Sequence, residues 1–122
     1  MKTTEEKNRL IAEFMSVNTN PNGTFELPQF GTIRPNGYFQ TEFNYEQLKF
    51  HTSWDWLMPV VDKIEDMRDE NNGCLFNVST IQTWTEIIDC RTSDTIAEGD
   101  AETKIQSVFD AVVEFIKWHN SI

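Results

Sequence analysis

The sequence holds few of the residues from which catalytic, metal and phosphate sites are built. It has two cysteines, two histidines and five glycines in 122 residues. The glycines are dispersed, so they form no phosphate-binding loop, and no HxxxH or CxxC spacing indicates a metal site. We therefore expect neither a metal nor a cofactor.

Long apolar runs are also missing. Asp55 and Asp62 interrupt the longest one, which is too short to span a membrane. The N-terminal stretch MKTTEEKNRL is charged and lacks the apolar core of a secretory signal, so we expect a cytoplasmic location. Cys74 and Cys90 could form one disulfide, but in a reducing compartment we expect them to be free.

Basic residues are scarce relative to acidic ones. The chain has 10 lysines and arginines against 20 aspartates and glutamates, a formal net charge of −10. This deficit argues against general nucleic-acid binding and against binding to anionic membranes. It favours solubility, or a partner protein with a basic surface.

The densest apolar stretch, residues 50–67, has the period of an amphipathic helix. At 100° per residue, the following side chains share its apolar face: Trp54, Leu57, Val60, Val61, Ile64 and Met67. Thr52 or Ser53 can cap the N-terminus. Pro59 would remove a backbone hydrogen bond from a helix that begins at Trp54, so we expect a bent helix or a start near Leu57.

The N-terminal part of the chain predicts one helix and one uncertain segment. Residues 3–16 form a helix in this interpretation, with Thr3 and Glu6 at capping-box spacing, and residues 16–24 form a loop. Residues 25–43 either form a hairpin around a turn at 34–37 or a long ordered loop whose aromatic side chains enter the core.

The C-terminal part predicts a hairpin and a helix. Residues 69–73 end the central helix, with Gly73 as its cap. Residues 74–82 and 84–91 form two antiparallel strands, residues 92–100 a polar loop, and residues 101–120 the last helix. The sequence therefore predicts a single α+β domain over residues 1–122, with three helices packed on a small antiparallel sheet.

No catalytic group can be assembled from the sequence, so we expect a binding protein rather than an enzyme. His51 and Asp55, four residues apart, could form a general-base pair, but no nucleophile is fixed beside them. Aromatic side chains can stack on a nucleobase and arginines can meet a phosphate. The candidate binding residues are Trp54, Trp56, Trp84, Trp118, His51, Asp55, Arg34 and Arg91. The alternative for the four tryptophans is that they complete a small core.

Two segments carry a resemblance. HTSWDWLMPVVDKIE (51–65) and KIQSVFDAVVEFIKWHN (104–120) resemble short proteins encoded by phages and prophages of Bacteroidetes. Those proteins carry a similar run, a pair of strands and a helix ending close to VVEFIKW. The order helix, two strands, helix is also similar in topology to the phage ABA sandwich domain.

The resemblance implies an accessory protein of a phage or mobile element that acts in the host bacterial cell. One hypothesis is a binding protein that blocks a host defence component with a basic surface. The alternative is a sponge that sequesters a signalling nucleotide in an aromatic pocket, in a homo-oligomer with pockets at its interfaces. A virion or structural component is a more remote alternative.

Overall fold

A computed structural model describes residues 4–16, 24–33, 35–69 and 73–121. The chain forms two compact units, Met1–Lys49 and Phe50–Ile122. Helices and small antiparallel sheets occur together, which confirms the predicted α+β class. No described helix has the length and apolar character needed to cross a membrane. A single domain over the whole chain stays a prediction.

The N-terminal unit joins one helix to two short antiparallel ladders. Its elements are α1 (Thr4–Met15), β1 (Phe25–Glu26), η1 (Pro28–Phe30), β2 (Thr32–Ile33), β3 (Phe39–Gln40), β4 (Glu42–Phe43) and η2 (Tyr45–Gln47). β1 pairs with β4 and β2 pairs with β3, so the ladders are nested around one turn. Gly37 has a φ of +85° in that turn, a conformation glycine adopts without strain. The predicted hairpin is thus confirmed, whereas the capping role of Thr3 lies outside the described residues.

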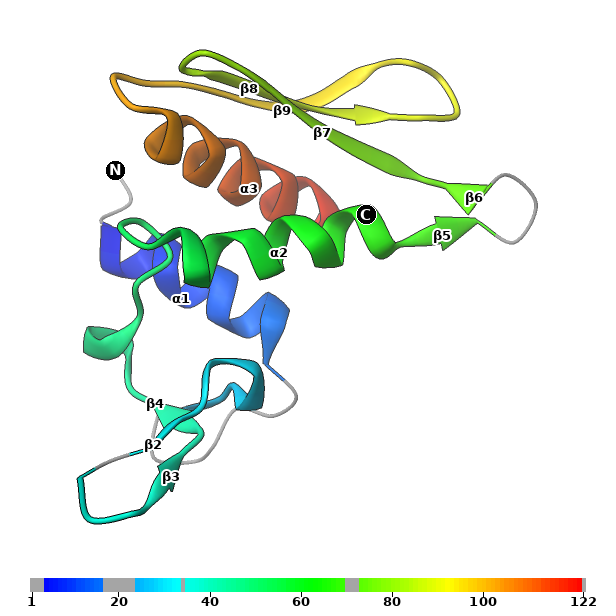
Figure 1. The fold of residues 1–122 in the computed structure, drawn as a ribbon. Helices are drawn as coiled ribbons and strands as arrows, with labels where there is room; N and C mark the ends of the chain where they lie inside the picture. The colour runs from blue at the N-terminus through cyan, green and yellow to red at the C-terminus, as the bar shows by residue number, and fades with distance from the viewer. Residues whose placement is uncertain (1–3, 17–23, 34, 70–72, 122) are drawn as a thin grey trace. The chain divides into compact units, whose positions relative to one another are not determined.

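The C-terminal unit is a three-stranded sheet with helices on one side. Its elements are α2 (Trp54–Asp66), β5 (Arg68–Asp69), β6 (Gly73–Cys74), β7 (Phe76–Ile81), β8 (Trp84–Asp89), β9 (Thr95–Asp100) and α3 (Lys104–Asn120). The sheet has the order β7-β8-β9, and α3 lies along one of its faces (Figure 1). α2 contacts β7 and α3. β7 and β8 confirm the two predicted strands.

The third strand, β9, was predicted as part of a polar loop, and that prediction was wrong. Its sequence TIAEGD has two apolar side chains and no β-strand periodicity that stands out. The strand forms because it pairs with β8 and because α3 packs closely against it. At Gly99 an added Cβ would lie 2.8 Å from the Ala111 nitrogen and closer still to the Ser107 carbonyl oxygen. Only glycine permits this approach of strand and helix.

The start of α2 is one of the two predicted alternatives, whereas its end differs from the prediction. The helix begins at Trp54 with Ser53 as its N-cap, and Pro59 lies inside it, so the late start near Leu57 was wrong. Burial of the apolar face outweighs the one backbone hydrogen bond that Pro59 removes. The helix ends at Asp66, and Gly73 belongs to β6 with a φ of +79°, so Gly73 is not the helix cap.

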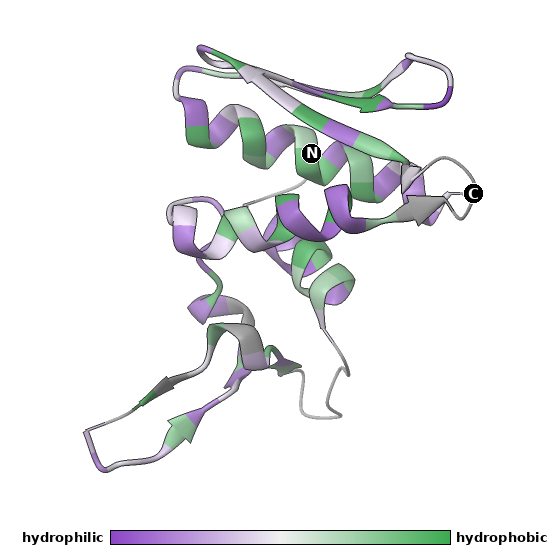
Figure 2. Ribbon diagram, turned by 45° about the vertical axis from the view of Figure 1, so that its right-hand side comes forward, coloured by the Kyte–Doolittle hydropathy of each residue, from purple (hydrophilic) through white to green (hydrophobic). Residues whose placement is uncertain are grey.

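The core of the C-terminal unit lies between the sheet and the apolar faces of the helices. The fully buried large side chains of this unit are Phe50, Leu57, Val60, Ile64, Ile87, Phe109, Val112, Val113, Phe115 and Ile116. Hydrophilic and hydrophobic residues alternate along α3 (Figure 2). Thr103 caps α3 by accepting a hydrogen bond from the Gln106 backbone N–H at 3.2 Å, which sets its start three residues later than predicted.

Candidate functional site

Two of the four candidate tryptophans pack on phenylalanines. The ring of Trp56 meets Phe50 edge-on, with centroids 5.3 Å apart. Trp118 packs on Phe76 at 5.8 Å and on Phe115 at 5.9 Å. Aromatic pairs in this range stabilise a core beyond the area that they bury. Trp56 and Trp118 therefore complete the core, as the alternative interpretation of the tryptophans predicts.

The other two tryptophans lie at surfaces. Trp54 was expected on the buried face of the central helix, yet 39% of it is exposed. The reason is its position in the first turn of α2, where the helix passes the end of β7 and the start of α3 at a groove rather than at the core. Trp84, the first residue of β8, is half-buried. Trp54 and Trp84 thus mark two separate surfaces.

His51 and Asp55 do not share a helix face. His51 lies in the turn before α2, and its ring is 6.1 Å from that of Phe109. Asp55 is exposed in the first turn of α2, where the helix dipole favours a carboxylate. Both positions are explained by local structure.

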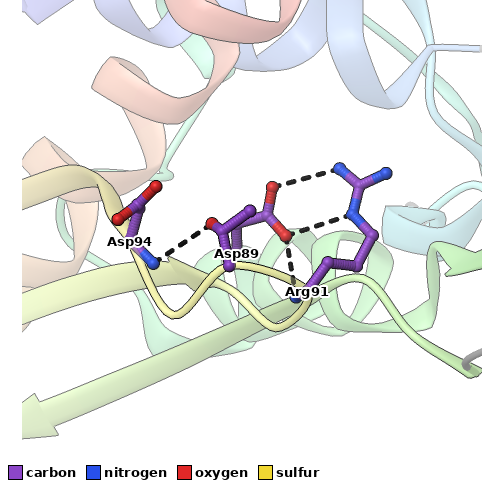
Figure 3. Close-up of polar contacts among 4 residues, drawn as sticks. Asp89, Arg91 and Asp94 are labelled. Atoms are coloured by element: carbon purple, nitrogen blue, oxygen red, sulfur yellow. Dashed lines mark hydrogen bonds and ion pairs between the residues drawn. The ribbon is translucent and has the colours of Figure 1, made fainter.

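Arg91 is engaged by Asp89. Its guanidinium donates two hydrogen bonds to the Asp89 carboxylate, at 3.1 Å from Nε and 3.0 Å from Nη2, and its backbone N–H donates a third at 2.9 Å (Figure 3). These hydrogen bonds hold the pKa of Asp89 below its usual range. They brace the turn between β8 and β9, so Arg91 is committed to structure. Arg34, the other candidate, lies outside the described residues.

The prediction of free cysteines was wrong. Cys90 is disulfide-bonded, and no described cysteine is free. Cys90 lies beside the residue between β6 and β7, because its backbone N–H donates a hydrogen bond to the Leu75 carbonyl at 2.9 Å. Disulfides persist mainly in oxidising compartments, so the cysteines do not support the reducing compartment expected from the sequence.

A first candidate site is the face of the sheet that points away from α3. Thr85, Ile87 and Asp89 of β8 are buried toward the helix, so the alternate residues point the other way. Strand register adds their cross-strand partners to this face. We call it the acidic sheet face, defined by Ile81, Trp84, Glu86, Ile88, Glu98 and Asp100. Figure 1 shows no element of this unit over it.

The acidic sheet face combines like charges with exposed apolar area. Glu86 lies directly opposite Glu98, and Trp84 lies opposite both Asp100 and Ile81. Ile81 is 63% exposed. Glu86 accepts a hydrogen bond from the Thr95 hydroxyl at 3.1 Å, but none of the three carboxylates forms an ion pair with any described residue. Like charges directly opposite each other destabilise a sheet, so this face is not optimised for stability.

The acidic sheet face continues to the open edge of β9. Within the described sheet, β9 pairs with β8 alone. A hollow of about 420 Å³ follows this edge, lined by residues 95–98 and by Glu114 of α3. Glu114 is paired with Lys117 at 2.9 Å. Unpaired backbone groups at such an edge can bind an extended segment of another chain.

A second candidate site is a groove between α2, β7 and α3. It has a volume of about 320 Å³ and is lined by Trp54, Met58, Val61, Glu65, Val78, Thr80, Lys104 and Val108. We call it the Trp54 groove. Met58 is 42% exposed, so two large apolar side chains are open to solvent at its mouth. A site of this size and apolar character is typical of a small-ligand pocket.

A chain of hydroxyl groups runs inward from Thr80, which lines the Trp54 groove. Thr80 and Thr85 are joined at 3.0 Å, and Thr85 and Ser107 at 2.9 Å. Ser107 donates to the Lys104 carbonyl at 2.7 Å. The chain links β7, β8 and the first turn of α3, and its two ends, Thr80 and Lys104, both line the groove.

Sequence reasoning missed most residues of both sites. It could have found Glu86, because the alternation in 84–89 predicts that Trp84 and Glu86 share a face. Glu98 and Asp100 could not be found, since they belong to the strand that was taken for a loop. Thr80 and Lys104 come to line one groove only through tertiary packing.

The donor groups of the described residues do not gather into a metal site: nowhere do three His, Cys, Asp or Glu side chains come together. Comparisons of the chain with models of protein families, with curated proteins and with solved structures give no match.

Proposed function

We propose that this protein acts by binding, not by catalysis, and that the acidic sheet face binds a basic surface of a partner protein. The observation that carries the proposal is the opposition of Glu86 and Glu98 beside Trp84. A basic partner would supply the cations that the described part of the chain does not place there, and Trp84 and Ile81 would supply apolar contact area. Tryptophan is the residue type most enriched at interface hot spots.

The negative charge of the chain also indicates what kind of partner it binds. A second copy of this chain would bring further carboxylates against Glu86, Glu98 and Asp100 at a net charge of −10 per chain. Like-charge contacts of this kind suppress association. A partner with lysines and arginines would instead be attracted over a distance, at a rate that falls as salt screens the charges.

A nucleotide sponge receives less support. It needs cations that converge on an aromatic pocket, but Arg91 is bonded to Asp89. The Trp54 groove has one cation, Lys104, among its described lining residues, and Glu65 lines the same groove. A nucleotide with several phosphates would meet that carboxylate.

The biological setting that we propose follows from the resemblance of residues 51–65 and 104–120 to phage and prophage proteins. In that setting the partner is a component of the host cell, such as a defence protein, and binding blocks it. The proposal about the acidic sheet face does not depend on this setting, because it concerns the charge of the partner.

The test is capture of partners from host lysate on the immobilised full chain, at low and at high salt, with charge-reversal variants. We expect a basic protein to be captured at low salt, to be released as salt rises, and to be lost with Glu98→Lys or Trp84→Ala. Glu46→Lys is the matched control, because Glu46 is exposed and lies in the N-terminal unit. It makes the same change in net charge and should retain the partner.

Two results would count against the proposal. If Glu46→Lys weakens capture as much as Glu98→Lys, the effect is one of net charge and not of the acidic sheet face. If the captured protein is unaffected by both Glu98→Lys and Trp84→Ala, it binds elsewhere on the chain.

A further inference from the structure

In the chain of hydroxyl groups at the Trp54 groove, one contact fixes which hydroxyl donates in each hydrogen bond. A carbonyl oxygen can only accept, so in the contact between Ser107 and Lys104 the Ser107 hydroxyl must be the donor. Each hydroxyl has one proton. Ser107 must therefore accept from Thr85, and Thr85 must accept from Thr80.

This direction fixes what Thr80 can offer to a ligand. Its one hydroxyl proton is used inside the fold, toward Thr85. Its oxygen keeps lone pairs, so toward the groove Thr80 is a hydrogen-bond acceptor and not a donor. A ligand group that meets Thr80 must be a donor.

The two charged residues of the groove extend this pattern. Glu65 is held by the Val78 backbone N–H, which donates to its carboxylate at 3.2 Å. Glu65 is therefore a fixed hydrogen-bond acceptor beside Val78 of β7. Thr80 lies two residues further along the same strand. Lys104 is exposed in the first turn of α3 and lines the same groove as Thr80. Its ammonium can only donate, so it suits a carboxylate.

The apolar wall sets the remaining part of the ligand. Trp54, Met58 and Val61 lie along one stripe of α2 and face Val78 and Val108. Trp54 and Glu65 are eleven residues apart, so the stripe is about 16 Å long at the rise of an α-helix. An apolar side chain of leucine or phenylalanine size fits a groove of about 320 Å³.

We infer that the Trp54 groove binds a free apolar α-amino acid in its zwitterionic form. The ammonium group donates to Thr80 and is favoured by the negative charge of Glu65 further along the groove, the carboxylate accepts from Lys104, and the side chain lies on Trp54 and Met58. A peptide has either a free ammonium or a free carboxylate at any one terminal residue, so the pairing of Thr80 with Lys104 selects the free amino acid.

This inference stands apart from the proposed function, since it uses no residue of the acidic sheet face. It also explains why Lys104 occupies the first turn of α3. A cation there is disfavoured by the helix dipole, so the structure gains no stability from its charge at that position.

The experiment is a titration of the full chain, followed by calorimetry and by backbone amide chemical shifts. The three probes are L-phenylalanine, phenethylamine, which lacks the carboxylate, and 3-phenylpropionate, which lacks the amine. We expect L-phenylalanine to bind at least about tenfold more tightly than either analogue, because each analogue loses one charge-assisted hydrogen bond. The amides that shift should be those of β7 and of the first turn of α3.

Single variants show which residue of the protein binds the carboxylate, the ammonium and the side chain of the ligand. Lys104→Met should weaken L-phenylalanine about tenfold and leave phenethylamine unchanged or tighter. Thr80→Val should weaken L-phenylalanine and leave 3-phenylpropionate unchanged. Trp54→Ala should weaken all three probes. Lys49→Met, in the N-terminal unit, is the control for loss of a positive charge and should change nothing.

Three outcomes would overturn the inference. L-phenylalanine does not bind, or either analogue binds as tightly as L-phenylalanine, or Lys104→Met has the same effect as Lys49→Met. Lys104 is exposed, so its variant is expected to fold and keeps the inference testable if Thr80→Val does not fold. If L-phenylalanine does not bind, the proposal that Glu98 and Trp84 bind a partner protein is unaffected. If no partner is captured, the inference about the Trp54 groove is likewise unaffected.

Discussion

Glu86 of β8 and Glu98 of β9 lie directly opposite each other, with both side chains on the sheet face that α3 does not cover. No described cation pairs with either one. Two carboxylates in this arrangement repel each other, and the fold retains them at a cost in stability. We attribute their presence to binding, and stability measurements can separate this cost from the binding itself.

Replacing Glu98 by lysine should stabilise the protein. The substitution converts a like-charge pair with Glu86 into an opposite-charge pair, which is worth about 0.2–1 kcal/mol across two strands. Urea unfolding at low salt should show the increase, and the increase should shrink as salt is added. Glu46→Lys, at an exposed position in the other unit, should give a smaller change. A loss of stability in Glu98→Lys would contradict the repulsion that we describe.

Removing the Ser107 hydroxyl should destabilise the C-terminal unit. Ser107 is fully buried, and in Ser107→Ala the Thr85 hydroxyl loses its acceptor. An unsatisfied buried donor costs about 1–3 kcal/mol. Thermal or urea unfolding measures the difference. Ser121→Ala, which removes an exposed hydroxyl at the end of α3, is the control and should be nearly neutral.

The same hydroxyl chain predicts non-additive energies. Ser107→Ala leaves the Thr85 hydroxyl without an acceptor, and Thr85→Val removes that hydroxyl. The loss of stability in the double variant should therefore be smaller than the sum of the losses in the two single variants. The coupling energy should be at least about 0.5 kcal/mol, as for residues in one hydrogen-bond network. Strict additivity would show that the chain of hydroxyls does not act as a unit.

Gly99→Ala should separate β9 from α3. The added methyl group would lie 2.8 Å from the Ala111 nitrogen, which is backbone and cannot move aside as a side chain would. Overpacking of this kind costs about 1–3 kcal/mol. Amide hydrogen exchange should show the loss of protection in β9 and in the first half of α3. Unchanged protection in Gly99→Ala would mean that strand and helix are further apart than described.

The pair of Asp89 and Arg91 predicts a dependence on pH. The folded pKa of Asp89 lies below its usual value of about 3.9, because the Arg91 side chain and then its backbone N–H donate to the carboxylate. The stability from this pair is therefore fully present above that value and is lost as pH falls through the folded pKa. Asp89→Asn should be less stable than the parent at neutral pH, and the difference should narrow below about pH 4. A difference that stays constant down to pH 2 would rule out this linkage.

The disulfide at Cys90 predicts a response to reduction. The purified protein should show no reactive thiol until a reductant is added, and reduction should lower the free energy of unfolding by about 2–4 kcal/mol. Maleimide labelling of protein taken directly from cells tests whether the bond exists there. Full labelling without reductant would restore the expectation of free cysteines.

The elements that the sequence predicted well are those with a strong period of their own. α3 repeats apolar residues at helical spacing along its 17 residues, and β7 and β8 are rich in β-branched residues, so local pattern and tertiary environment agree. The prediction for β9 was wrong because its hydrophobic pattern is weak and its pairing with β8 depends on the packing of α3 against Gly99. The predicted burial of Trp54 was wrong, because the helical period shows which residues share a face but not whether another element covers that face.

The sequence by itself determined the class of the fold, the negative charge and the lack of catalytic motifs, because these depend on composition and on local periodicity. The tertiary structure decided which side chains meet. Thr80 and Lys104 lie 24 positions apart in the chain, and Glu86 and Glu98 lie 12 apart. Their pairing depends on strand register and on the seating of α3 over the sheet, which are long-range contacts that no local pattern encodes.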